Sequence, residues 1–262
     1  MKYIETDDLD NLPGIRLKPD DRFSFRCHDE LECFNRCCRN LNLFLYPYDV
    51  RQLKQCLQIT SDQFLDTYVD IVLREGNFFP EVLLKMKTDK DLPCVFLSDT
   101  GCRVYKSRPY TCRLFPVEQG FFFDARNPHP QIELIHLFRP PDFCRGPQEL
   151  KKWTPRQWSM DQGSDRLNEM TREWAELKRR FQNDPWGGEG LDGPKAKMAF
   201  MAIYNIDRFR DFVFNSSFLK RYRVQPKLKR QMKTGDTALL IFGMSWINFY
   251  LWGIRSNRFS IR

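Results

Sequence analysis

The sequence predicts an α+β protein that is mainly helical, with a few short antiparallel strands and cysteine-bearing loops around a metal centre. Three observations predict it. Apolar residues recur at helical spacing over several long segments, short apolar runs are separated by Pro and Gly, and all nine cysteines lie before residue 145. With 262 residues, 42% of them hydrophobic, the chain can bury a core without disulfides.

Capping signals predict the first two helices. Pro47 suits the first position of a helix that runs to Leu57, because proline lacks only an N–H that has no partner there. Thr60 and Gln63 form a capping box for a second helix, whose apolar stripe runs to near Gly76. The same spacing predicts further helices at 148–162, 165–181, 195–214 and 236–252.

Short strands are expected between turn signals, at 82–86, 95–97, 120–123 and 131–138. The turn sequence 98–101, Ser-Asp-Thr-Gly, predicts a hairpin that brings Cys94 and Cys102 close together. The strand signals stop near Pro147. We therefore expect a cysteine-cluster metal-binding domain at 1–147 and a helical C-terminal region at 148–262 packed on it.

The run 238–254 is nearly free of charge but has only 17 residues, including Ser245 and Asn248. That length is at the lower limit for crossing a bilayer, so we expect a buried helix and no membrane span. The first residues lack the apolar stretch of a secretory signal. A cytoplasmic, reducing location is therefore expected, in which disulfides are improbable. The odd number of cysteines is a further argument against a closed disulfide framework.

The net charge of +8 invites a nucleic-acid interpretation. Many basic residues, however, lie next to cysteines, where they would stabilise thiolates. Nucleic acid is therefore not the expected partner. It remains a third hypothesis, acting through basic residues of the C-terminal half: Arg208, Arg210, Lys220, Arg221, Arg223, Lys227, Lys229 and Arg230.

The candidate metal ligands are cysteines in three separated stretches. Thiolates at short spacing are soft ligands for zinc or iron–sulfur clusters. The eight candidates are Cys27, Cys33, Cys37, Cys38, Cys94, Cys102, Cys112 and Cys144. The ninth, Cys56, is expected to be a small buried residue on its helix.

Adjacent cysteines on an extended backbone point different ways, so Cys37 and Cys38 are not expected to bind one metal atom together. Eight ligands with such a pair allow two four-ligand centres that share a wall, or one centre and a looser set of thiols. The paired C-x2-C knuckles of zinc ribbons are absent, which favours iron–sulfur over zinc.

The segment from Cys102 to Pro116, with Tyr105, Arg108-Pro109 and Cys112-Arg113 at fixed spacing, resembles the YkgJ-like cysteine-cluster family. This family is described by a CxxCxxCC signature and as a zinc- or iron-chelating domain. The resemblance covers 23 to about 146, and the helical segment 204–210 looks like a longer subfamily. The spacing of the first four cysteines is stretched relative to the signature.

The resemblance implies an iron–sulfur oxidoreductase-like protein, and a distant branch is similar to flagellin lysine N-methylases. Arg108 and Arg113, set among the ligands, are then expected beside the cofactor, where they would bond sulfurs and carbonyls or bind an anionic substrate. Whether the chain is an enzyme stays open. No P-loop, dinucleotide fingerprint, H-E-x-x-H or G-x-S-x-G motif identifies catalytic residues.

The leading hypothesis is thus a metal-binding protein, with an iron–sulfur cluster that supports a redox or protein-modification reaction. Its partner would be a protein or a redox carrier. The alternative is a non-enzymatic zinc-binding structural or interaction module.

Overall fold

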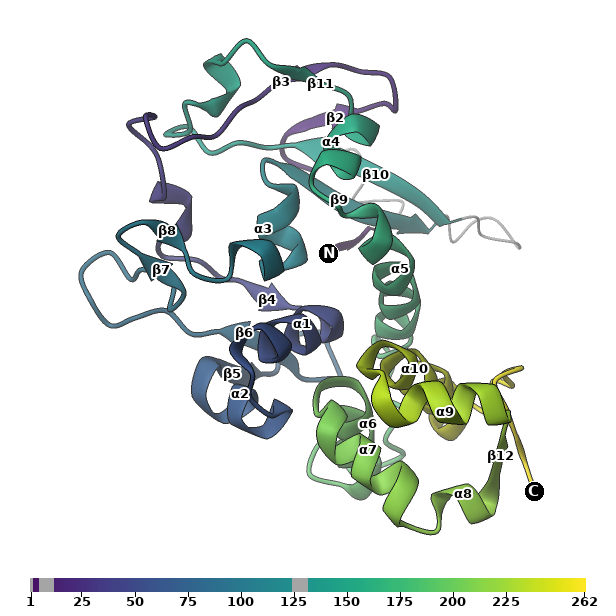
Figure 1. Cartoon of the computed structure of the whole chain (residues 1–262). Helices are drawn as coiled ribbons and strands as arrows, with labels where there is room; N and C mark the ends of the chain where they lie inside the picture. Colours follow the sequence, from purple (N-terminus) through teal and green to yellow (C-terminus); the bar gives the residue numbers. More distant parts are fainter. Residues whose placement is uncertain (1, 5–11, 124–131) are drawn as a thin grey trace. The chain divides into compact units, whose positions relative to one another are not determined.

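The computed structural model describes residues 2–4, 12–123 and 132–262, and it confirms an α+β fold of helices and small sheets (Figure 1). Residue contacts divide the chain into two compact units. The cysteine unit comprises 1–41 and 86–175, and the helical unit comprises 42–85 and 176–262. The contacts thus divide the chain elsewhere than at the expected boundary, residue 147, because 42–85 packs with the C-terminal helices.

The main sheet of the cysteine unit has four strands in the order β1-β9-β10-β2. They are β1 (Lys2–Ile4), β9 (Val117–Phe123), β10 (Ile132–Phe138) and β2 (Ile15–Leu17). The first pair is parallel and the other two are antiparallel. Phe121 and Phe123 of β9 pack against Ala175 of α5 (Asp165–Arg180). The expected strand at 131–138 is confirmed from residue 132, and Gln131 lies outside the described residues.

Short elements carry the rest of the cysteine unit. Two two-stranded ladders pair β3 (Phe23–Ser24) with β11 (Lys152–Trp153), and β7 (Leu97–Ser98) with β8 (Gly101–Cys102). The unit also contains the short helices η2 (Arg36–Cys38), η3 (Tyr105–Ser107), α3 (Tyr110–Leu114), η4 (Gly146–Gln148) and α4 (Pro155–Asp161). A helix was expected at 148–162, but the observed helix, α4, begins only at Pro155, so the prediction was wrong for residues 148–154. Residues 152–153 pair with β3 there, and proline suits only the start of a helix.

The helical unit begins with β4 (Phe44–Leu45), α1 (Pro47–Leu57) and α2 (Ser61–Tyr68). Both predicted starts are confirmed, including the Thr60–Gln63 capping box. The second helix ends at Tyr68, well before Gly76. The β-branched residues that follow form β5 (Val69–Val72), which pairs with β6 (Glu81–Leu84) in the sheet β4-β6-β5.

Five further helices of the helical unit follow residue 190. They are α6 (Pro194–Tyr204), α7 (Ile206–Asn215), α8 (Phe218–Arg221), α9 (Pro226–Thr234) and α10 (Asp236–Trp252). The single helix expected at 195–214 was wrong. It breaks at Asn205, with ψ at 71°, where the side chain accepts from the N–H of Arg208 and caps α7.

The apolar run at 238–254 lies mostly in α10, much of which is buried as expected. Gly243 lets α10 approach α6 closely, because a Cβ there would lie 2.6 Å from the carbonyl oxygen of Ala202. In the described part of the chain, no helix combines the length and the apolar character needed to span a bilayer. A short ladder of β12 (Tyr222–Val224) and β13 (Phe259–Ile261) completes the unit.

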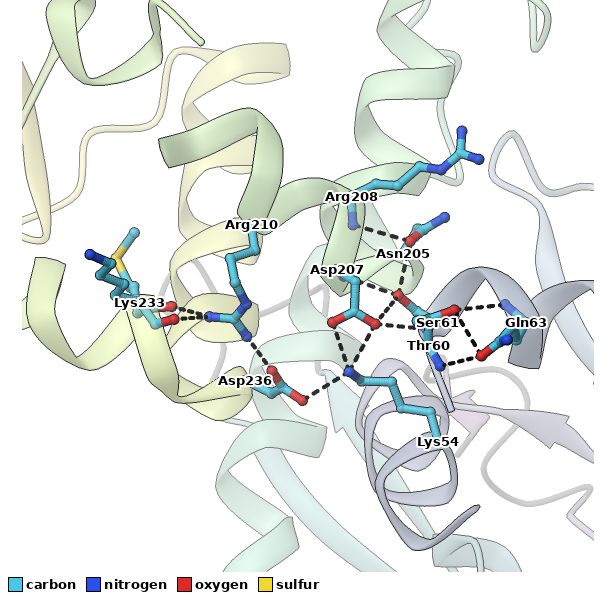
Figure 2. A network of polar contacts seen from close by, with 11 residues as sticks. Lys54, Thr60, Ser61, Gln63, Asn205, Asp207, Arg208, Arg210, Lys233 and Asp236 are labelled. Atoms are coloured by element: carbon cyan, nitrogen blue, oxygen red, sulfur yellow. Dashed lines mark hydrogen bonds and ion pairs between the residues drawn. The ribbon is translucent and has the colours of Figure 1, made fainter. Parts of the chain in front are cut away.

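A polar network joins four helices of the helical unit (Figure 2). Lys54 of α1 donates from Nζ to both carboxylate oxygens of Asp207 in α7, each at 2.9 Å, and lies 3.2 Å from Asp236 at the start of α10. Ser61 of α2 donates to Asp207 from its backbone N–H at 2.7 Å and from its hydroxyl at 2.9 Å. Burial alone would raise the pKa of Asp207, but these donors lower it below its ordinary value.

Arg210 extends this network to α9. Its guanidinium pairs with Asp236 and donates to the carbonyl oxygens of Met232 and Lys233, in the last turn of α9. These carbonyls have no partner within the helix, so the arginine satisfies groups that would otherwise need water. The segment 204–210, which resembled a longer subfamily by sequence, therefore anchors α1, α2, α9 and α10.

Candidate metal centre

The first two cysteine stretches are joined through the backbone. Cys38, in η2, accepts at its carbonyl oxygen from the N–H of Cys94 at 2.8 Å. Asn40 donates from its N–H to the carbonyl oxygen of Leu92 at 2.9 Å, and a bridge links Arg39 to Pro93. These contacts hold the Cys37–Cys38 pair beside Cys94.

The third stretch is joined to the first in the same way. Arg26 donates from its N–H to the carbonyl oxygen of Gly146 at 3.2 Å. Arg145 donates from its N–H to Sγ of Cys33 at 3.2 Å. The approach is close, because a Cβ at Gly146 would overlap the ring of Phe25 and lie 3.0 Å from the carbonyl oxygen of Arg26. Cys144 is therefore held near Cys27 and Cys33.

The predicted hairpin between Cys94 and Cys102 is present as the β7–β8 ladder, in which Leu97 pairs with Cys102. The two thiols lie close enough that Cys102 raises the pKa of Cys94. Burial is the larger cause, and together the effects raise the pKa of Cys94 to about 11, against lowering by the N–H of Phe96. Cys112 follows on α3, ten residues beyond Cys102.

Cys27 and Cys144 form a second neighbourhood with Cys33. Burial, followed by the charges of Cys144, Cys33 and Cys38, raises the pKa of Cys27 to about 11. Burial also raises the pKa of Cys144, and Cys33 adds to the effect. The negative charge of one thiolate therefore disfavours ionisation of the neighbouring thiols, as expected for anionic groups that lie close together.

The vicinal pair connects the two neighbourhoods. The two sulfur atoms of Cys37 and Cys38 lie 4.0 Å apart. Their hydrogen bond raises the pKa of Cys37 strongly and lowers the pKa of Cys38 to about 7. The charges of Cys27 and Cys112 also raise the pKa of Cys37. The charge of Cys38 in turn raises the pKa values of Cys27 and Cys94.

All eight predicted cysteines therefore form one set linked by charge–charge interactions. Cys56 lies outside it, on α1 of the helical unit. It is exposed, so its expected burial was wrong. All nine cysteines lie in the described residues, and none of them forms a disulfide.

The eight cysteines lie near one another, but their sulfur atoms are not arranged around one ion. In the part of the chain that the structure describes, no three His, Cys, Asp or Glu side chains are arranged as ligands of one metal ion. The donors nevertheless fit a soft metal in kind, because thiolates that repel one another are stabilised by a cation between them. The fit rests on the chemistry of the donors.

Arg108 and Arg113 brace the second stretch. Arg108 donates to the carbonyl oxygen of Tyr105 at 2.8 Å and stacks over that ring, 4.0 Å from its centroid. Arg113 donates to the carbonyl oxygens of Gln162 at 2.8 Å and Lys106 at 2.7 Å. The expected bonds to carbonyls are present, and they tie η3 and α3 to the residue that follows α4.

Sequence reasoning missed the backbone that positions the sulfurs. The N–H of Arg145 and the missing side chain of Gly146 bring the third stretch to Cys33. The only signal was that an arginine and a glycine directly follow Cys144.

Residues 26–130 match the model of the CxxCxxCC family, whose description is "putative zinc- or iron-chelating domain". The match confirms the resemblance to the CxxCxxCC domain over these residues, and it supports metal binding by this part of the chain. Cys144 lies beyond the matched residues. No curated protein and no solved structure matches the chain.

Proposed function

We propose that the cysteine unit binds metal through Cys27, Cys33, Cys37, Cys38, Cys94, Cys102, Cys112 and Cys144, as iron–sulfur rather than zinc. The observation that carries the proposal is the set of hydrogen bonds that brings the three cysteine-bearing stretches together, from Cys94 to Cys38, from Arg26 to Gly146 and from Arg145 to Cys33. A structural role for one buried cysteine would not require the other seven nearby.

The neighbourhoods support two centres. Cys27, Cys33 and Cys144 would hold one. Cys94 and Cys102 would hold the other, and we assign Cys112 to it because it follows Cys102 on the same stretch. Cys37 and Cys38 would each complete one set of four, since each interacts with members of both groups. The vicinal pair would then be the wall between the centres.

An iron–sulfur cluster would supply one-electron redox chemistry at this place. The chain's own residues would bury the thiols, supply positive charge and hold the three stretches together. Arg39 already lowers the pKa of Cys38, after the larger effect of Cys37. Arg108 and Arg113 would keep the second stretch in position. This chemistry would serve a redox or protein-modifying reaction in a reducing, cytoplasmic setting, with a protein or redox carrier as partner.

The second candidate is a zinc-binding interaction module without catalysis. The family description favours it as much as iron, because it names both metals. Zinc would stabilise the loop-rich cysteine unit directly, since ligation and folding are coupled. Such a protein would be colourless and would have no redox transition.

Anaerobic purification followed by metal analysis and a visible spectrum tests the proposal. We expect iron with inorganic sulfide and broad visible absorption that bleaches on reduction. Cys56→Ser is the matched control, because Cys56 lies in the helical unit and should leave metal content unchanged. Stoichiometric zinc without colour would favour the module, and protein without bound metal would contradict both.

A further inference from the structure

The positive charge of the chain is concentrated at its C-terminal end. Residues 212–262 contain 10 of the 42 Lys and Arg residues and only 1 of the 34 acidic residues, Asp236. The preceding 211 residues hold 32 basic and 33 acidic residues, so they are almost neutral as a group. The net charge of +8 therefore comes from this segment and not from the cysteine-bearing stretches.

The single acid does not neutralise this surface. Asp236 is buried, and its carboxylate pairs with Lys54 and Arg210 inside the network of Figure 2. Arg210, which pairs with Asp236, also donates to the carbonyl oxygens at the end of α9. The ion pair that neutralises Asp236 therefore also fixes α9, the most basic helix of the segment. The cations around it face solvent without an acidic neighbour from their own segment.

These cations occupy adjoining elements, α8, β12, α9 and the end of β13 (Figure 1). The β12–β13 ladder places Arg223 opposite Ser260, and Arg262 donates from its N–H to the carbonyl oxygen of Arg221 at 2.9 Å. We define the basic face by its exposed members: Lys220, Arg221, Arg223, Lys227, Lys229, Arg230, Lys233 and Arg262. Within the described chain, none of these side chains forms an ion pair.

We propose that the basic face binds nucleic acid through its phosphate backbone. A nucleic acid carries a regular row of charges, and neutralising them releases condensed counterions, so exposed cations that form no ion pair suit this ligand. The polar composition of the face argues for contacts to phosphates and against base-specific recognition. The proposal is independent of the metal, and it adds a binding partner to the function proposed above.

An anionic membrane is a weaker candidate. A helix that lies in a bilayer surface needs an apolar face to insert. In α9 the apolar side chains are Leu228, which is partly buried, and Met232, which is fully buried, so no apolar face is left for lipid. The large exposed apolar residues of the segment are Tyr250, at 36%, and Ile261, at 64%, too few for an inserting surface.

The test uses the full chain and a fluorescent mixed-sequence oligonucleotide, single-stranded or duplex, with binding followed by anisotropy from low to physiological salt. The face variant carries Lys227→Gln, Lys229→Gln and Arg230→Gln. The control carries Lys90→Gln, Lys152→Gln and Arg156→Gln, which remove the same charge from exposed positions of the cysteine unit. Far-UV circular dichroism and metal content should be the same in all three proteins.

We expect the wild type and the control to bind, and the face variant to bind about a hundredfold more weakly, with a slope of log K against log salt smaller by about three. No binding at low salt, or equal binding by both variants, would overturn the proposal. Binding to phosphatidylserine vesicles or to polyglutamate, but not to the oligonucleotide, would also overturn it and identify a lipid or an acidic protein instead.

Discussion

The ammonium group of Lys54 lies 2.9 Å from both carboxylate oxygens of Asp207, and the lysine side chain is only 9% exposed. An unpaired charge in the interior of a protein is costly, so the lysine and the two carboxylates, Asp207 and Asp236, stabilise one another as charged groups. The pair joins α1 to α7, and its two residues are 153 positions apart in sequence.

Replacing this lysine should destabilise the helical unit. In Lys54→Met, Asp207 and Asp236 lose a common partner, and we expect a loss of about 2–4 kcal/mol, at the lower end for a broken buried pair because Asp207 is partly exposed. Urea unfolding followed by far-UV circular dichroism measures it. Lys85→Met is the control, since its ion pair with Asp70 is long, at 3.8 Å, and exposed, so its change should stay below about 1 kcal/mol. Equal losses in both variants would contradict the role given to Lys54.

The lowered pKa of Asp207 predicts how stability depends on pH. Its folded pKa lies below its unfolded value, so its contribution is complete above the unfolded pKa and is lost as pH falls through the folded pKa. Asp207→Asn should therefore be less stable than the wild type near neutral pH. The difference should shrink as pH falls from about 5 to about 2. A difference that stays constant in unfolding experiments over this range would show that the ionised carboxylate is not responsible.

The two neighbourhoods of thiols predict how metal is lost. If Cys27, Cys33 and Cys144 share one centre, Cys33→Ser should remove about half of the bound metal, and Cys102→Ser the other half. The double variant should lose nearly all of it. Metal analysis per folded chain decides. Complete loss in each single variant would indicate one shared centre, and unchanged content would contradict ligation by that cysteine.

The close approach at Gly146 predicts a steric effect on the third stretch. In Gly146→Ala the new methyl group would overlap the ring of Phe25, so the two backbones must separate, at a cost of about 1–3 kcal/mol. Metal content should fall too, because Cys27 and Cys144 lie on those backbones. Phe25→Leu tests the cause in a double-mutant cycle: if the ring is the obstacle, the double variant should be more stable than the sum of both losses predicts. Additive losses would place the cause elsewhere.

Helix starts could be predicted because their signals are local. Pro47 and the Thr60–Gln63 capping box need only neighbouring residues, and both are confirmed. The errors occurred where a distant partner decided the outcome. Residues 69–72 continued an apolar helical stripe, yet pairing with β6 made them a strand. Asn205 looked like an ordinary helical residue, but its side chain caps α7 and also donates to Asp62 at 2.8 Å.

The amino-acid sequence alone determined the candidate donors, eight cysteines that include a vicinal pair, because the chemical identity of a side chain is a covalent property. The proximity of Cys144 to Cys27 and Cys33 had to await the fold, since backbone hydrogen bonds between segments more than 100 residues apart create it. The same holds for the charge of the C-terminal segment. The sequence gives the composition of this segment. Only the tertiary structure shows that Asp236 is buried against Lys54 and Arg210, while the residues of the basic face remain exposed.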